Sequence, residues 1–152
     1  MVFLFKKIVF IKFKGDIAMN FIDEALKSNL HGDDFLQAMA DIYKEPDVSD
    51  ILDRYPKFIK DVILIIDYDT TLAMDGLWEV VNGNMESEFA ELLIALDNYG
   101  AIHEANILRT AQKLAPEQED EFEKLYDELA LNNDYDGFWD LVREYIDKNL
   151  DY

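Results

Sequence analysis

Apolar residues recur at helical spacing along the second half of the chain. Four stripes of this kind follow one another after residue 86. Gly100 and Pro116, residue types that typically end helices, stand after the first two stripes. Because only short links separate the stripes, we expect antiparallel helices in a compact all-α multi-helix bundle. The stripes consist of Phe89, Leu92, Leu93 and Leu96; of Ile107, Ala111 and Leu114; of Phe122, Leu125, Tyr126 and Leu129; and of Phe138, Leu141, Val142, Tyr145 and Ile146.

The first half of the chain predicts further helices. Apolar spacing in residues 22–30 indicates one helix. Asp33 is expected to be the N-cap of a second, over residues 34–44, with Tyr43 on its apolar face. Pro46 is expected to end that helix, since the residue before a proline avoids helical backbone angles. Two helices in series are therefore predicted before residue 46.

Residues 58–66 allow two interpretations. Phe58, Val62, Ile65 and Ile66 have the spacing of a core helix, but the β-branched run 62–66 also fits a buried strand. The chain as a whole has 152 residues, 50% of them hydrophobic, which is enough for one domain with a real core. We therefore expect residues 15–152 to form a single helical domain.

Residues 1–14, MVFLFKKIVFIKFK, differ in character from the rest. They hold four lysines and no acid, and Lys6 and Lys7 divide the apolar residues into runs much shorter than a membrane span. No small-residue cleavage pattern follows, which argues against a signal peptide. Three interpretations stay open: a short strand or arm docked on the body, a membrane-surface segment, and an extension upstream of a natural start at Met19.

The chain is strongly acidic. It has 14 Lys and Arg against 33 Asp and Glu, a net charge of −19. Since residues 1–14 contain four of the lysines, residues 15–152 carry 10 basic and 33 acidic side chains, a net charge of −23. Such a field repels nucleic acids and anionic membranes and attracts basic proteins. The same charge would also arise if the acids did no more than keep the protein soluble.

Motifs that carry catalysis or bind metals are incomplete. There is no cysteine, which also fits a cytoplasmic protein. His103-Glu104 begins like a zinc-protease motif, but Ile107 stands where its second histidine would be. Residues 132–143 resemble a calcium loop, but Arg143 takes the place of the closing glutamate. A turn followed by a helix capped by Asp136 explains the loop more simply, so we expect no enzymatic activity, no cofactor and no metal.

Four segments give the chain a family resemblance. They are residues 72–84 (LAMDGLWEVVNGN), 89–108 (FAELLIALDNYGAIHEANIL), 125–129 (LYDEL) and 138–146 (FWDLVREYI). In this order they resemble a bacterial family of acidic helical proteins, one member of which is a DNA mimic that occupies a transcription repressor. The resemblance covers about residues 50–150. In the family's glycine-rich stretch Asp75 replaces the first glycine, Leu77 a phenylalanine and Glu79 a glutamine, so the chain reads as a diverged relative.

Charge and resemblance together predict a non-enzymatic binding protein. It would occupy a basic protein partner, with DNA mimicry on a transcription regulator as the sharpest form of this hypothesis. An immunity or antitoxin-like protein that neutralises a basic toxin is the alternative. Direct nucleic-acid or membrane binding is not expected, and a homodimer is left open. The acids predicted to form the partner-binding face are Asp120, Glu121, Asp127, Glu128, Asp134, Asp136 and Asp140.

Overall fold

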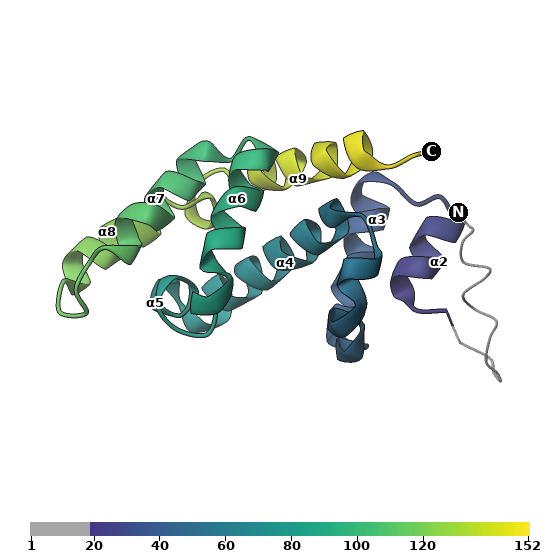
Figure 1. Cartoon of the computed structure of the whole chain (residues 1–152). Coiled ribbons are helices and arrows are strands. Elements are labelled where there is room, and N and C mark those ends of the chain that lie inside the picture. Colours follow the sequence, from purple (N-terminus) through teal and green to yellow (C-terminus); the bar gives the residue numbers. More distant parts are fainter. Residues whose placement is uncertain (1–18) are drawn as a thin grey trace.

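The computed structural model describes residues 19–152, and every regular element among them is a helix (Figure 1). This confirms the all-α prediction, while the strand or arm predicted for residues 1–14 lies outside the described residues. The α-helices are α2 (Phe21–Lys27), α3 (Gly32–Met39), α4 (Lys57–Asp75), α5 (Leu77–Val81), α6 (Phe89–Tyr99), α7 (Ile102–Gln112), α8 (Glu119–Glu128) and α9 (Tyr135–Asn149). The 3₁₀ helices are η1 (Ala40–Tyr43), η2 (Pro46–Arg54), η3 (Glu86–Glu88) and η4 (Ala130–Asn132).

Helix α4 is the centre of the bundle. It contacts α3, α5, α6 and α9, and both η1 and η2 pack on it. The run 62–66 lies in this helix, which settles the choice between helix and strand. A helix that is hydrophobic nearly all round must be enclosed by other elements, and these neighbours enclose it. Figure 1 shows α4 running between α5 at one end and α2 and α3 at the other.

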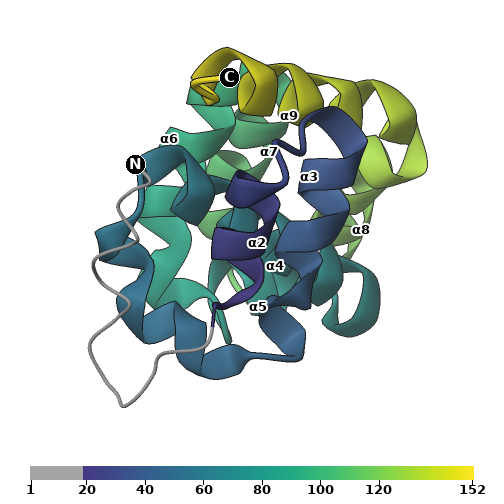
Figure 2. The same ribbon diagram turned by 90° about the vertical axis from the view of Figure 1, so that its right-hand side faces the viewer.

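Helix α6 packs against both α7 and α9. Helices α6 and α7 form a hairpin that turns at Gly100, whose φ of 85° is the left-handed conformation expected of a terminating glycine. Helix α9 packs against α3, α4 and α6, so the last helix of the chain lies beside α3 (Figure 2). Buried residues from Phe21 to Ile146 form a single hydrophobic cluster. The short links predicted from the sequence connect packed neighbours at α6–α7 and at α7–α8, whereas α8 and α9 are joined through η4.

The start and end of the 34–44 helix differ from the prediction. Helix α3 begins at Gly32, and Asp33 is not its N-cap; His31 holds that position without a side-chain hydrogen bond. The Gly32 N–H instead donates to Asp147 Oδ1 on α9, at 2.7 Å, so a distant carboxylate replaces a local cap. Beyond Ala40 the chain tightens into η1, which turns Tyr43 outward to 53% exposure instead of onto the apolar face.

The cap of α9 was also assigned to the wrong aspartate. Helix α9 begins at Tyr135, and Asp134 is the N-cap because its Oδ1 accepts the Gly137 N–H at 3.0 Å. Asp136 lies inside the first turn. A side chain at Gly137 would collide with the Asp134 carboxylate, so glycine allows the cap to form. The helix therefore starts two residues earlier than the sequence pattern indicated.

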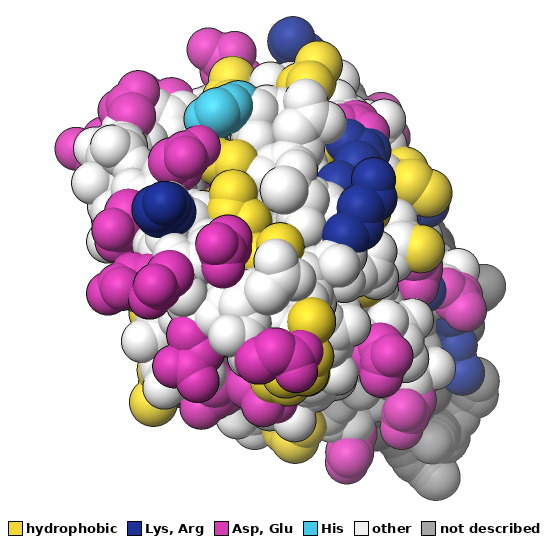
Figure 3. Space-filling model, turned by 90° about the vertical axis from the view of Figure 1, so that its left-hand side faces the viewer, with side chains coloured by type: hydrophobic (Ala, Val, Ile, Leu, Met, Phe, Trp, Pro, Cys, Tyr) yellow, Lys and Arg dark blue, Asp and Glu magenta, His cyan; other side chains and the backbone are white. Residues whose placement is uncertain are grey.

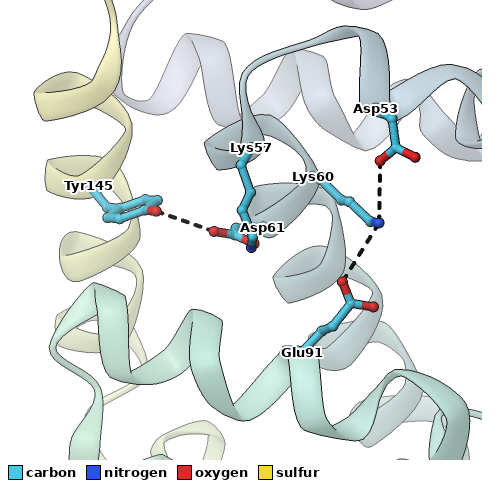
Figure 4. Close-up of polar contacts among 6 residues, drawn as sticks. All are labelled: Asp53, Lys57, Lys60, Asp61, Glu91 and Tyr145. Carbon is cyan, nitrogen blue, oxygen red and sulfur yellow. Dashed lines mark hydrogen bonds and ion pairs between the residues drawn. The ribbon is translucent and has the colours of Figure 1, made fainter.

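One carboxylate is buried inside the bundle, where α4 meets α9 (Figure 4). Asp61 is 2% exposed and accepts hydrogen bonds from Lys57 Nζ at 2.7 Å and from the Tyr145 hydroxyl at 3.2 Å. Burial, together with the nearby Asp61 charge, raises the pKa of Tyr145 to about 12. Asp61 therefore fixes α9 on α4 through a tyrosine that stays protonated over the ordinary pH range.

Among residues 19–152, no helix is both long enough and apolar enough to cross a bilayer.

Candidate protein interface

All seven predicted acids are exposed, and they lie on two consecutive helices. Asp120, Glu121, Asp127 and Glu128 belong to α8, and the other three lie at the start of α9. The 3₁₀ helix η4 joins these helices and contacts both of them. We call the seven side chains the acidic face. The structure thus places them in one continuous segment, residues 120–140.

Helix α8 is amphipathic, yet none of its residues is buried. Phe122, Leu125 and Tyr126 are half-buried, and Leu129, immediately after the helix, is fully buried. Asp120 and Asp127 lie seven residues apart and therefore share the outer side of the helix, about 10.5 Å from each other along its axis. A few apolar contacts on the inner side hold α8, and its acids line the solvent side.

The charge of α8 is almost uncompensated. The helix holds six acids and one lysine, and among the described residues none of its acids takes part in an ion pair. Two members of the acidic face do have local partners. Asp140 pairs with Arg143 at 3.0 Å, and Asp134 caps α9. The five others, in the described part of the chain, form no side-chain hydrogen bond or ion pair that would occupy them.

An open groove, which the sequence did not predict, lies beside the acidic face. Its volume is about 390 Å³, and one wall is the start of α5 with Trp78. The other wall is α8, which contributes Phe122 and Tyr126 together with Glu119 and Glu123. Trp78 is 39% exposed and meets Phe122 edge-on, with ring centroids 5.6 Å apart. Figure 3 shows this end of the molecule, with hydrophobic side chains exposed among Asp and Glu.

A buried glutamate holds the link between the two helices of the acidic face. Glu104 on α7 is 5% exposed; it accepts the Tyr68 hydroxyl at 2.6 Å and the Ala130 N–H of η4 at 3.0 Å. Burial raises the pKa of Glu104, and the two hydrogen bonds oppose part of that rise. His103, the residue before it, is exposed. The two residues of the incomplete zinc motif therefore differ in environment, one buried and one in contact with solvent.

In the calcium-like loop, residues 132–143, the side chain of Arg143 forms hydrogen bonds with other protein groups. Arg143 donates to Asp33 Oδ1 and to Asp140 Oδ1, both at 3.0 Å, so its charge ties α9 to α3. Among residues 19–152, no three His, Asp or Glu side chains are grouped so that they could hold a metal ion. Chemically, the site offers exposed carboxylates and an aromatic groove, which suit the binding of a cationic and partly apolar surface.

Comparisons with known proteins found no similar protein. No model of a known protein family matches the chain, and no curated protein and no solved structure matches it.

Proposed function

We propose that this protein is a non-enzymatic binding protein whose acidic face occupies a basic surface of a protein partner. The observation that carries the proposal is the uncompensated charge of α8. Its ten residues span about 15 Å at 1.5 Å per residue. Six acids and one lysine leave about one net negative charge per 3 Å, close to the ~3.4 Å per phosphate of one DNA strand.

DNA mimicry on a transcription regulator is the sharpest form of this proposal. A groove that binds DNA is lined by Lys and Arg, and it gains affinity by releasing counterions from the phosphates. A rigid helix with a similar charge per unit length would use the same attraction. The net charge of −23 on residues 15–152 supports this direction. The competing hypothesis is an immunity-type protein with one dedicated toxin partner.

The test begins with affinity capture from the native host, followed by purification of the captured protein. Its affinity for the full chain is then measured between about 50 and 300 mM salt, a range over which phosphate-like contacts lose orders of magnitude. We expect a steep loss of affinity and displacement of this protein by duplex DNA. Salt-sensitive binding without DNA competition would favour the immunity protein, and affinity that is independent of salt would refute electrostatic occupation.

Two variants that change the net charge by the same amount test whether the partner binds at α8. The first variant neutralises α8: Asp120→Asn, Glu121→Gln, Asp127→Asn and Glu128→Gln. The control makes the same change in net charge at four exposed acids of α2 and the η2 region: Glu24→Gln, Glu45→Gln, Asp47→Asn and Asp50→Asn. We expect the α8 variant to lose affinity at least about tenfold more than the control, mainly through slower association. Equal losses would mean that only the net charge matters.

A further inference from the structure

The groove between α5 and α8 combines an apolar lining with negative charge. Both of its walls carry aromatic or apolar side chains, which are Leu77 and Trp78 on α5 and Phe122 and Tyr126 on α8. Its α8 wall carries two carboxylates, Glu119 and Glu123. Exposed apolar surface that is rimmed by polar groups is typical of protein interaction sites.

We propose that this groove is the anchor point of the interface. It takes a bulky apolar side chain from a basic segment of the protein partner, and Lys or Arg residues beside that side chain pair with Glu119 and Glu123. This proposal rests on the proposed function and names the chemistry of the partner. Interface energy is concentrated in a few well-packed residues, among which Trp and Tyr are over-represented.

The negative charge of Glu119 and Glu123 favours a cationic occupant of the groove over an anionic one. Nucleic acids and anionic lipids would bring negative charge next to Glu119 and Glu123, and a second copy of this chain would add its own charge of −19. A cationic segment is attracted instead. Its Lys or Arg groups can also contact Trp78, which is 39% exposed; a cation over an aromatic ring is stabilised by roughly 0.5–1 kcal/mol at an exposed site.

The apolar side chains of the groove add an interaction whose strength does not depend on ionic strength, which carboxylates alone cannot provide. Ion pairs at the rim weaken as salt rises, whereas burial of an apolar side chain against Trp78 and Phe122 does not depend on charge screening. Burying a Leu or Phe side chain contributes on the order of 1.5–3 kcal/mol before ordering costs. The complex would therefore combine salt-dependent association with an anchor that slows dissociation.

The test uses the full chain and two synthetic peptides of equal charge. The first has the sequence Lys-Lys-Leu-Leu-Lys-Lys, and the second replaces both leucines by glycine. The chain has two tryptophans, so Trp139→Phe leaves Trp78 as the only one, and excitation at a wavelength that tyrosine does not absorb makes it the reporter. We expect the leucine peptide to shift Trp78 emission to shorter wavelength and to bind at least about fivefold more tightly, equivalent to about 1 kcal/mol.

Two pairs of substitutions locate the contact. Glu119→Gln with Glu123→Gln removes the charge of the groove wall. Asp120→Asn with Asp127→Asn removes the same charge from the outer side of the same helix. We expect the first pair to weaken the leucine peptide several times more than the second. A further pair, Tyr126→Ala against the exposed Ile94→Ala on α6, tests the apolar wall in the same way.

Several results would overturn the anchor while leaving the proposed function intact. These are equal affinity of the two peptides, binding that leaves Trp78 emission unchanged, and equal effects of the two charge pairs. Dissociation of a dimer by the leucine peptide, seen by sedimentation, would mean that a second copy fills the groove. The proposed function itself fails on a different measurement, which is salt-independent binding of the purified partner.

Discussion

Eleven of the nineteen residues of α4 are buried, whereas α8 has ten residues and none of them is buried. Both helices belong to the same bundle, but α4 contacts helices on several sides and α8 mainly contacts α7 and η4. Their electrostatics differ as well. The buried carboxylate of α4 has a lysine and a tyrosine as partners, and the acids of α8 have no ion-pair partner among the described residues. The comparison separates a helix that supports the fold from one that is available to a partner.

The largest expected difference between the two helices lies in hydrogen exchange. Isolated helices of about ten residues are marginal in water, so α8 depends on its few inner contacts. Amides in α4 should exchange only by global unfolding, which for domains of this kind costs about 5–15 kcal/mol. Amides in α8 should exchange several kcal/mol more easily. Native-state exchange read by mass spectrometry or NMR measures this, and equal protection in the two helices would contradict the comparison.

Truncation of apolar side chains should separate the same two helices. Ile65 on α4 is fully buried, so Ile65→Ala should lower the free energy of unfolding by about 2–5 kcal/mol. Leu125 on α8 is half-buried, and Leu125→Ala should cost less than half as much because solvent already reaches the site. Urea denaturation of both variants compares them directly. A Leu125→Ala loss as large as that of Ile65→Ala would make α8 part of the core.

Most of this architecture could be predicted from the sequence, and the reason is local. The stripe Phe89–Leu96 and the glycine at 100 specify α6 by periodicity and termination alone. The errors at the two ends of α3 arose where packing against distant parts of the chain decided the outcome, whereas the wrong cap of α9 was a local error between Asp134 and Asp136. Asp147 accepts a hydrogen bond from the Gly32 N–H although the two residues are 115 positions apart, and no local sequence pattern predicts that contact. The 3₁₀ turn at Ala40 similarly depends on how η1 packs against α4.

The candidate site could be predicted only in part, for a similar reason. Acids on the polar side of an amphipathic helix are exposed by default, so the positions of Asp120 and Asp127 followed from periodicity. The groove could not be predicted because Trp78 and Phe122 are 44 residues apart and meet only after folding. Helix α5, which presents Trp78, has five residues and gives almost no periodic signal. Sequence reasoning therefore predicted the acidic side chains of the candidate site and missed the apolar groove beside them.

A smaller effect is expected from ion pairs, and it sharpens the contrast between buried and exposed charge. Lys57 is the cationic partner of the buried Asp61, although its own side chain is 63% exposed. Lys57→Met should therefore cost about 1–2 kcal/mol, which is below most of the range of about 1.5–3 kcal/mol for hydrogen bonds to charged groups because solvent screens the exposed lysine. Lys44 pairs with Asp41 on the surface at 3.6 Å, and Lys44→Met should cost about 0.5 kcal/mol or less. Thermal or urea unfolding at neutral pH compares the two, and equal losses would mean that Asp61 does not need its lysine.

The smallest effect concerns pH and the buried Glu104 that anchors η4 between the two helices of the acidic face. Burial raises its pKa above the usual 4.5, so from about pH 4.5 upward the folded chain binds more protons at this group than the unfolded chain. The free energy of unfolding must then fall as pH rises through that window. Glu104→Gln has no such proton, and its amide can still accept from Ala130 N–H and donate to the Tyr68 oxygen. The variant should therefore lose less stability than the parent between about pH 4.5 and 7.

The control for this measurement is Glu86→Gln, an exposed site that changes the net charge by the same amount. Part of the slope should remain in both variants, because burial also raises the pKa of Asp69 and of Glu88. Urea denaturation at closely spaced pH values gives the slope for each protein. The prediction is contradicted if the free energy of unfolding depends on pH in the same way in Glu104→Gln, in the parent and in Glu86→Gln. Glu104 would then have the same pKa in the folded and in the unfolded chain. In that case the hydrogen bonds from Tyr68 and Ala130 fully offset its burial, and η4 is held by a carboxylate that stays ionised over this range.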